Sequence, residues 1–444
     1  MKPTSRRDFI KKTALGSAAF TIGGMGMSAK SYANIVGSND RIHVAVMGTN
    51  SRGAGLTGIF TRQPNTHLLY VCDVEESPRQ RNGNGKKNGG NPKAEKDIRK
   101  VFADKQTDAV VIAAPDHWHA PATIMACQAG KHVYCEKPCS HNPHEGELAI
   151  AAARKYDRVV QVGSQRRSWP ILQQAMAELH NGAIGKIHYA KGWYTNNRGP
   201  IGIGKTIPVP SNIDFDLWQG PAPRKPYRDN LIHYNWHWFW HWGTGEALNN
   251  GTHEIDVIRW GLGLSYPTSV SSEGGRFWYQ DDWETPDTQT IDIRFGNDCL
   301  VSWEGRSCNG RDTEGKDRGV IFYGEGGAME TGGNDYKIFD LKNKLIKQAG
   351  MNDVVVDGRN LASPNAGMDE KHIINFLESI RNHTRPTADI EELHKSTLLV
   401  QLGNIAWRTG RRLLIDPTNG HILNDPEANN LWSRSYEPGW ELKV

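Results

Sequence analysis

Short apolar runs alternate with stretches of helical periodicity from Arg41 to about Gly163. This is the pattern of a parallel sheet covered by helices. The apolar runs predict strands at residues 42–47, 68–72, 109–114, 132–135 and 159–162. Residues 79–96, between the second and third of these strands, are dense in Gly, Asn and Lys and are expected to form a solvated loop.

After Gly163 the pattern changes to strand-like runs broken by Gly and Asn turns, at residues 187–193, 289–295, 300–304 and 319–323. Such runs indicate a mostly antiparallel sheet. Helical periodicity returns at residues 370–382 and 394–409. We therefore expect an α/β fold class with two domains: a doubly wound domain at residues 39–163 and an α+β domain at residues 164–444. The last helices are candidates to pack back on the first domain.

The N-terminal residues have a different composition. Arg6 and Arg7 precede a mild Ala, Gly and Met stretch at residues 14–27 and a small-x-small pattern at residues 31–33. This order is typical of a twin-arginine export signal. A membrane anchor is the alternative, but the stretch is shorter than the ~20 strongly apolar residues that a span needs. We expect residues 1–33 to be a signal peptide, the protein to be periplasmic or otherwise exported, and no membrane segment to remain.

Charge and cysteine content narrow the class of protein further. The formal net charge of the 444 residues is +4, but the predicted signal holds six basic residues against one acidic residue, which leaves −1 for the remainder. A near-neutral chain without a basic run argues against nucleic acid as a partner. The six cysteines show no CxxC pair and no disulfide framework, so they are expected to be reduced core residues, although export would permit oxidation of Cys299 and Cys308.

A glycine-rich loop follows the first predicted strand. Gly48, Asn50 and Gly53 occupy the glycine positions of a G-x-G-x-x-G pattern, with Ser51 and Arg52 inside it. Such a loop brings backbone N–H groups and a helix N-terminus close to a pyrophosphate. Asn50 replaces the middle glycine, and because Asn tolerates a left-handed backbone better than most residues, the turn is still expected to form.

Asp73 ends the second predicted strand and strengthens this interpretation. A carboxylate at that place can hydrogen-bond an adenosine ribose and would repel a 2′-phosphate. The loop alone is a weak signal, since many glycine-rich loops are only turns. Together the two features predict a site for NAD, with NADP less favoured.

Several motifs carry a family resemblance. Residues 114–119 (APDHWH), 129–133 (AGKHV), the triplet Glu136-Lys137-Pro138 and residues 162–167, 243–246 and 250–254 resemble the Gfo/Idh/MocA oxidoreductases, over nearly the whole chain after the signal. The later motifs are similar to those of exported bacterial members. The resemblance implies a Rossmann domain that holds a nicotinamide cofactor and an α+β domain for substrate binding whose open sheet forms the oligomer interface, so a homodimer or homotetramer is expected.

The resemblance also implies roles for particular residues. Lys137 is expected at the substrate hydroxyl beside the nicotinamide, and His253 matches the family's acid/base histidine. Where many members read D-x-x-x-H, this chain has Asn249, which cannot exchange a proton. The predicted cofactor site comprises Gly48, Asn50, Ser51, Arg52, Gly53, Asp73, Pro115, His117, His119, Glu136 and Lys137. His119 alternatively caps the following helix, and Glu136 orients Lys137 or contacts a ribose.

Oxidation of a secondary alcohol needs a group that takes the hydroxyl proton while the cofactor takes the hydride. His253 can accept a proton near neutral pH, and Lys137 can stabilise a developing alkoxide. In the reverse assignment a desolvated Lys137 is the base and His253 positions the substrate. The alternative without a catalytic role is that Lys137 lies at the surface and forms an ion pair with Glu136.

Residues 235–242 (NWHWFWHW) are the most unusual stretch of the chain. Strand alternation would place Trp236, Trp238, Trp240 and Trp242 on one face. One or two of these indoles, with Trp238 as the candidate, would stack on a sugar ring; the alternative for each is a core position. His233, His237 and His241 have helical spacing, but no carboxylate or Cys completes a ligand set, so no metal is predicted. Arg166, after the fifth strand, and Asn249 are further candidates for substrate binding.

These observations predict an exported NAD(H)-dependent oxidoreductase that acts on a secondary hydroxyl of a sugar or glycoside. Outside the cytoplasm no free NAD pool reoxidises the cofactor, so tight binding is expected. One alternative is a redox-neutral NAD-dependent glycosidase that oxidises, eliminates and reduces again. Another is a non-catalytic protein that binds sugar and NAD. Asn50 and Asn249 support this alternative, because they replace the glycine and the aspartate of the respective motifs.

Overall fold

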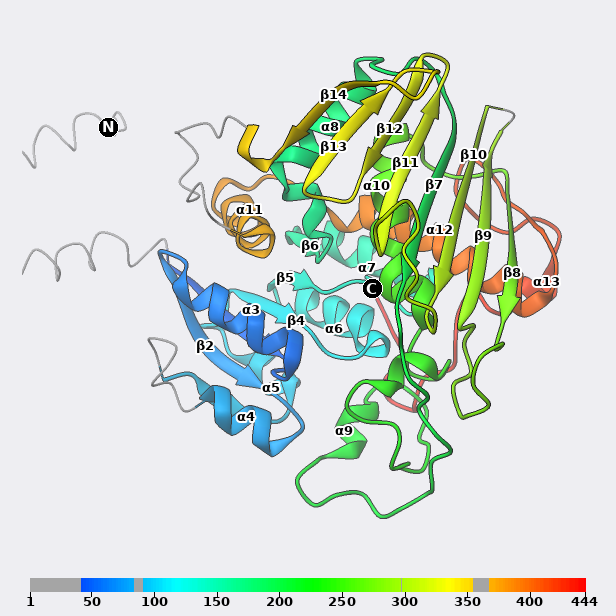
Figure 1. Ribbon diagram of the computed structural model, residues 1–444. Helices are drawn as coiled ribbons and strands as arrows, with labels where there is room; N and C mark the ends of the chain where they lie inside the picture. The colour runs from blue at the N-terminus through cyan, green and yellow to red at the C-terminus, as the bar shows by residue number, and fades with distance from the viewer. Residues whose placement is uncertain (1–40, 84–90, 297, 354–366) are drawn as a thin grey trace, which may run out of the picture. The chain divides into compact units, whose positions relative to one another are not determined.

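A parallel sheet forms the first part of the described chain. The structure is a computed structural model that describes residues 41–83, 91–296, 298–353 and 367–444; the predicted signal lies outside these residues. The sheet has the strand order β3-β2-β1-β4-β5-β6, and Figure 1 labels β2, β4, β5 and β6. Its strands are β1 (Ile42–Met47), β2 (Thr66–Cys72), β3 (Lys93–Glu95), β4 (Ala109–Ile112), β5 (His132–Cys135) and β6 (Val160–Val162).

Helices cover both faces of this sheet because the strands are apolar on both. On β1, Val44 and Val46 belong to one buried cluster and Ala45 and Met47 to another, and all four are nearly inaccessible. The helices that follow the first five strands are α3 (Ser51–Arg62), α4 (Glu76–Gly83), α5 (Ile98–Ala103), α6 (Asp116–Gln128) and α7 (Pro143–Lys155).

The five predicted strands are all present, with ends that differ by at most two residues. The prediction of a loop at residues 79–96 is wrong in part. Helix α4 extends to Gly83, and β3 adds an edge strand beside β2 at Lys93–Glu95. Two of the three β3 residues are exposed, so this edge strand has no apolar run that a sequence pattern could detect.

A second, mixed sheet follows. Among the described residues it has nine strands in the order β14-β13-β12-β11-β7-β10-β9-β8-β15, and of its pairs only β7 with β10 is parallel. Its strands are β7 (Ile187–Thr195), β8 (Ser269–Gly275), β9 (Thr288–Phe295), β10 (Cys299–Arg306), β11 (Arg318–Gly324), β12 (Gly327–Thr331), β13 (Asp335–Phe339), β14 (Leu345–Gly350) and β15 (Leu413–Leu414). The predicted fold class is confirmed.

One face of the second sheet is covered and the other is open. On β9, buried residues alternate with the exposed Thr290, Asp292 and Arg294. The covering helices are α8 (Pro170–His180), α10 (Thr252–Leu262) and α12 (Ile390–Thr409), which share one hydrophobic core with the strands. Shorter elements are η2 (Gln165–Ser168), α9 (Phe215–Gln219), η3 (Asn235–Trp238), η4 (Ala247–Gly251), η5 (Met351–Asp353) and α13 (Pro426–Asn429).

The helices near the C-terminus also contact the first sheet. In α11 (Met368–Asn382), Ile373, Phe376 and Leu377 complete the buried cluster that contains the β1 and α3 side chains. In α12, Leu393 packs in the cluster on the opposite face. Both helices therefore contribute to the cores of the first domain, although they lie more than two hundred residues after it in the sequence.

Candidate active site

The loop between β1 and α3 forms the turn that the sequence predicts, but Ser51 and not Asn50 takes a positive φ in it. Gly48 has a positive φ of 78°, and a Cβ there would lie 2.5 Å from the carbonyl oxygen of Ala113. A Cβ at Gly53 would overlap the carbonyl oxygen of Gly48. Asn50 is extended, with φ −87°, and Ser51 takes the positive φ of 32°. The turn forms as expected, but Asn50 does not need the tolerance of a left-handed backbone from which the turn was predicted.

Asp73 lies at the end of β2 and fixes this loop. Its carboxylate accepts hydrogen bonds from the Thr49 backbone N–H at 2.7 Å, from the Thr49 hydroxyl at 3.1 Å and from the Glu75 N–H at 3.0 Å. Burial raises the pKa of Asp73, while these donors act in the opposite direction. The loop, the end of β2 and the N-terminus of α3 thus meet at one place, and together they fit a dinucleotide.

Arg52 ties the loop to two distant segments. Its Nε donates to Glu136 at 2.8 Å, and its terminal nitrogens donate to the Asp369 carboxylate of α11 at 2.7 and 2.8 Å. The negative charge of Glu136 and Asp369 raises the pKa of Arg52 even though burial lowers it. Glu136 therefore pairs with Arg52 and not with the Lys137 side chain, so the surface ion pair considered for Lys137 does not form.

Lys137 follows β5, and its side chain reaches η4. Its Nζ donates to the backbone carbonyl of Asn249 and, at 3.0 Å, to Asn249 Oδ1. Burial lowers the pKa of Lys137 more than the nearby carboxylates of Glu136, Asp116 and Glu246 raise it. An ammonium has three N–H donors, and Asn249 takes two of them. One donor remains for a substrate hydroxyl.

Asn249 lies in the π-helical turn η4, directly before α10. Its Nδ2 donates to Glu246 Oε1 and to the Tyr234 hydroxyl, both at 3.3 Å, and Arg198 forms an ion pair with Glu246. The amide thus links Lys137 to a buried carboxylate that the sequence pattern did not single out. Wide turns of this kind often occur at functional sites because they shift a side chain out of helical register.

His253 belongs to the first turn of α10 and lines the same cavity as Lys137. Its Nδ1 is buried and has no hydrogen-bond partner among the described residues. Burial, and then the charges of Lys137 and Arg318, lower the pKa of His253 well below its usual value. The imidazole is therefore neutral at pH 7 and can accept a proton.

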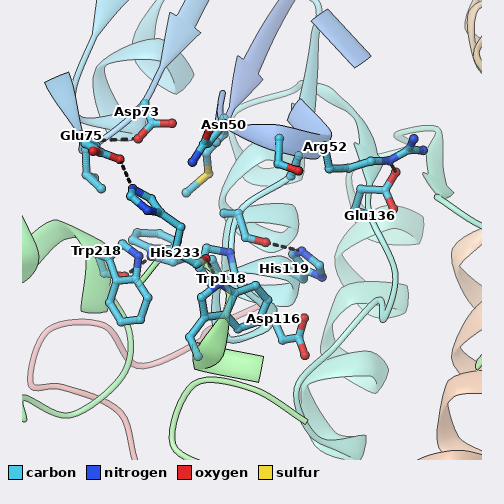
Figure 2. Close-up of a pocket in the computed structure, with 18 of the residues that line it drawn as sticks. Asn50, Arg52, Asp73, Glu75, Asp116, Trp118, His119, Glu136, Trp218 and His233 are labelled. Carbon is cyan, nitrogen blue, oxygen red and sulfur yellow. Dashed lines mark hydrogen bonds and ion pairs between the residues drawn. The ribbon is translucent and has the colours of Figure 1, made fainter. Parts of the chain in front are cut away.

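The cavity that contains these groups measures about 630 Å³, which suits a cofactor together with a small substrate. Figure 2 shows Asn50, Arg52 and Asp73 around it and the 2.7 Å ion pair of His233 with Glu75. The predicted site residues that line it are Gly48, Asn50, Ser51, Arg52, Asp73, Pro115, His119, Glu136, Lys137, Asn249 and His253. Both ring nitrogens of His119 lie near backbone carbonyls, of Ala114 at 2.8 Å and Pro138 at 2.6 Å.

Four predicted residues do not line the cavity. Gly53 acts only through its close approach to Gly48. His117 is fully buried, and its Nε2 lies 2.9 Å from the Trp218 carbonyl. Arg166 forms an ion pair with the buried Glu254 at 3.3 Å, and Trp238 stacks on Trp283 with a centroid distance of 4.0 Å.

The tryptophan-rich stretch is not a strand. Residues 235–238 form the 3-10 helix η3, and turns follow. Trp238 and Trp242 are 1% and 2% exposed and contact Trp283 and Trp218 respectively, so they are core residues. Trp236 alone of the four lines the large cavity. The alternation rule failed because each indole found a different aromatic partner, which no local pattern encodes.

The three histidines at helical spacing do not converge. His233 pairs with Glu75, His237 Nδ1 lies 2.6 Å from the Tyr234 carbonyl and His241 Nε2 lies 2.7 Å from the Pro223 carbonyl. The described residues contain no cluster of three or more His, Cys, Asp or Glu side chains that could hold a metal ion. No helix in this part of the chain is long and apolar enough to cross a membrane, and the six cysteines are buried free thiols.

Sequence reasoning missed several groups at the cavity. Asp116 is fully buried and accepts a hydrogen bond from the Thr244 hydroxyl at 2.5 Å, and burial raises its pKa. Tyr234 and His237 line the cavity from the second domain, and Gln165 does so from η2. Asp116 stood inside the quoted APDHWH motif, so its charge was a visible signal. Gln165 stood inside the quoted motif at residues 162–167, whereas Tyr234 carried no signal.

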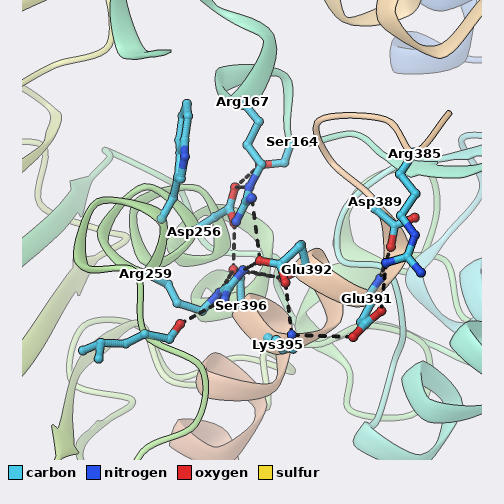
Figure 3. Close-up of polar contacts among 12 residues, drawn as sticks. Ser164, Arg167, Asp256, Arg259, Arg385, Asp389, Glu391, Glu392, Lys395 and Ser396 are labelled. Atoms are coloured by element: carbon cyan, nitrogen blue, oxygen red, sulfur yellow. Dashed lines mark hydrogen bonds and ion pairs between the residues drawn. The ribbon is translucent and has the colours of Figure 1, made fainter. Parts of the chain in front are cut away.

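A buried ion network lies next to the walls of the cavity that Gln165 and His253 line. Asp256 of α10 accepts hydrogen bonds from Arg167 at 2.7 and 3.0 Å, from Ser164 at 2.6 Å and from Ser396 at 2.7 Å (Figure 3). Arg167 and the Arg259–Glu392 pair belong to the same network. It joins η2, which carries Gln165, to α10, which carries His253. The network therefore fixes two walls of the cavity relative to each other.

The fold and the site together define a class: a dinucleotide-binding Rossmann domain followed by an α+β domain, with a cavity that both domains line. Residues 42–164 match the oxidoreductase family with an NAD-binding Rossmann fold, and residues 188–322 and 352–442 match that family's C-terminal alpha/beta domain. The chain belongs to the Gfo/Idh/MocA oxidoreductase family, as the resemblance implied.

Relatives of several activities are similar to this chain. Inositol 2-dehydrogenase of Rubrobacter xylanophilus is 30% identical over 36% of this chain and 46% of its own length. A glycosyl hydrolase family 109 protein of Saccharopolyspora erythraea is 23% identical over 46% of this chain and 48% of its own. The matches thus span about half the length of these relatives. Among solved structures, levoglucosan dehydrogenase in complex with NADH and levoglucosan has a TM-score of 0.66 at 16% identity, covering 85% of this chain and all of that one, which is a likeness of fold.

Proposed function

We propose that the protein is an NAD(H)-dependent oxidoreductase that transfers hydride between a secondary hydroxyl of a sugar or glycoside and a nicotinamide cofactor. The observation that carries the proposal is one cavity that joins the Gly48 loop and Asp73 to Lys137, Asn249 and His253. Relatives that are named as inositol and levoglucosan dehydrogenases support the substrate class.

The residues of the loop would hold the cofactor. Backbone N–H groups near the start of α3 would bind its pyrophosphate, and Asp73 would meet the adenosine ribose, which favours NAD over NADP. The bound cofactor supplies the acceptor or donor of the hydride. A fit is supported by the positions of Gly48 and Gly53, where a Cβ would collide with backbone.

The chain's own groups handle the proton. His253, neutral because it is desolvated, accepts the hydroxyl proton, and Lys137 donates a hydrogen bond that stabilises the negative charge on the substrate oxygen. Asn249 holds the Lys137 ammonium in place and takes no part in proton transfer. Asp116, with its raised pKa, adds a buried carboxyl beside this pair.

A redox-neutral glycosidase is the second candidate function, which the family 109 relative supports. Product analysis of the purified protein with an aryl glycoside separates the two. A keto sugar with the aglycone still attached, together with reduced cofactor, supports the oxidoreductase. Release of the aglycone without net change in the cofactor supports the glycosidase. Bound NAD whose redox state never changes would contradict both and leave a binding protein.

The proposal includes export, a tightly held cofactor and a homo-oligomer. Arg6 and Arg7 in the twin-arginine pattern support export, and the open face of the second sheet supports self-association. N-terminal sequencing of the protein from its native cell tests the cleavage after residue 33. Cofactor retention through gel filtration, with the mass measured by light scattering, tests the other two statements.

A further inference from the structure

A second cavity, of about 370 Å³, is lined by Trp240 and His241, whereas Trp236 and His237 of the same stretch line the first cavity. Its walls come from the start of α7, from α12, from residues 240–244 and from residues 431–435. None of the predicted site residues lines it. Its volume is within the range of small-molecule sites.

Four side chains that line this cavity each have one polar atom without a partner in the described part of the chain, and we call this group the polar floor. His141 Nδ1, Asn142 Nδ2, Gln401 Oε1 and Arg434 Nη1 are buried, and none of them has a hydrogen-bond partner among the described residues. Asn142 and Gln401 are only 5% and 3% exposed. A buried polar atom that has no hydrogen-bond partner destabilises the folded state, so four of them around one cavity call for an explanation.

The rest of each side chain is fixed, which defines what each free atom can do. His141 Nε2 lies 3.1 Å from the Trp240 carbonyl, so Nδ1 is the acceptor of a neutral ring. Asn142 Oδ1 accepts from the Glu145 N–H, which leaves Nδ2 as a donor. Gln401 Nε2 donates to Ser140, which leaves Oε1 as an acceptor. Arg434 Nε donates to Glu145, which leaves Nη1 as a donor.

Two free donors and two free acceptors suit hydroxyl groups, because each hydroxyl both donates and accepts. The rim adds an aromatic face and charge. Arg408 lies over the Trp240 ring at 5.0 Å, and Lys225 and Glu284 are exposed beside it. Since Glu145 neutralises Arg434, the rim carries two cations against one carboxylate.

We propose that this cavity is a second ligand site that binds an acidic monosaccharide: hydroxyl groups meet the polar floor, and the carboxylate meets Arg408 and Lys225 at the rim. The site does not depend on the proposed function, because it contains none of the groups assigned to the reaction. Two segments nevertheless run from one cavity to the other. Lys137 is four residues before His141, and the hydroxyl of Thr244 bonds Asp116 of the catalytic cavity.

Calorimetric titration of the NAD-loaded protein with D-glucuronate tests the proposal, with D-glucose as the neutral comparison. We expect saturable binding of glucuronate, weaker binding of glucose, and a loss of affinity for glucuronate of about ten-fold or more in the double variant Arg408→Met/Lys225→Met. Both substituted side chains are exposed, so the fold is expected to persist, which a thermal melt verifies.

The variant Lys137→Met is the matched control, because it alters only the catalytic cavity. Unchanged glucuronate binding in this variant supports a second site. Binding that is lost in Lys137→Met but unchanged in Arg408→Met/Lys225→Met would place the ligand in the catalytic cavity and overturn the proposal. A crystal soaked with glucuronate that shows only ordered water on the four free atoms would overturn it as well.

Discussion

Lys137 and His253 acquire their chemistry from burial. Desolvation lowers the pKa of both groups, so the imidazole is uncharged at neutral pH and the ammonium releases its proton more readily than that of an exposed lysine. The sequence identified both residues through their motifs. Their neighbours Asn249 and Arg318 come from segments more than a hundred residues beyond Lys137, so the sequence alone did not show the surroundings that bury the two groups.

The pH dependence of kcat/KM tests the division of roles between these two residues. A base with a lowered pKa stays active below pH 6.5, so the acid limb of wild-type activity is expected below that value; the alkaline limb, set by Lys137, is expected below pH 10.5. His253→Asn should lose the acid limb and Lys137→Met the alkaline limb, each with kcat reduced by about 10²–10⁴-fold.

The opposite assignment gives a different profile. If Lys137 is the base, activity rises as pH passes its pKa, and His253→Asn keeps the acid limb while KM increases. Nearly full activity of Lys137→Met would contradict both assignments. The thermal melts of the two variants serve as the control for folding.

Asp73 determines the preference for the cofactor in our interpretation. In Asp73→Ser the repulsion of a 2′-phosphate disappears, so the ratio of NAD to NADP affinity is expected to fall by about ten-fold or more. Fluorescence titration with NADH and NADPH measures the ratio. Because Asp73 also holds Thr49, Asp73→Asn is the companion variant: it keeps the shape of the side chain and removes the charge. An unchanged ratio in both variants would contradict the assignment.

Among the helices and loops, the site depends on ion pairs between elements that are distant in the sequence; we call these ion pairs joints. The Asp256–Arg167 pair fastens α10 to η2, and Arg52 fastens the loop to α11 through Asp369. Strand β1 and the loop after it were predictable because apolar periodicity and glycine act locally. The joints were not predictable, because nothing in the sequence shows with which carboxylate an arginine will form an ion pair.

Asp256→Asn should lower the free energy of unfolding by about 3–5 kcal/mol, because it leaves the Arg167 guanidinium buried with an uncharged partner. Urea denaturation measures this loss. Asp298→Asn is the matched control: it removes one member of the exposed pair with Lys186 and is expected to leave stability unchanged. Equal effects of the two substitutions would show that the buried network does not stabilise the joint.

At the scale of the whole molecule, buried neutral histidines lie in the two C-terminal helices that pack on the first domain. His372 of α11 and His394 of α12 are almost inaccessible, and burial lowers the pKa of each to about 4. Both helices contribute to the cores of the first domain, and His372 approaches the Val162 carbonyl of β6 at 2.9 Å. Protonation of either ring in place is unfavourable.

As the pH decreases, the protein should therefore begin to lose stability at a higher pH than a protein without such histidines. The unfolded chain binds these protons below about pH 6.5 while the folded chain does not until about pH 4, so stability that is complete above pH 6.5 is lost as the pH falls. We expect the Tm to decrease between pH 6.5 and 5, where ordinary carboxylates are still ionised. The variant His394→Asn should show a shallower decrease; a Tm that is constant over this window would contradict the argument.

The amino-acid sequence was enough to predict five strands of the first sheet, the α/β class, the dinucleotide loop and the two cavity residues Lys137 and His253, because periodicity, glycine positions and short motifs are local properties. It could not determine the edge strand β3, the fate of the four tryptophans or the partner of Arg52, since these depend on which surfaces meet. Only the folded structure shows that Trp238 stacks on Trp283 and that Arg166 pairs with Glu254. It also shows that Asn249 hydrogen-bonds Lys137 and that a second polar cavity exists. These facts arise from packing between segments far apart in the chain.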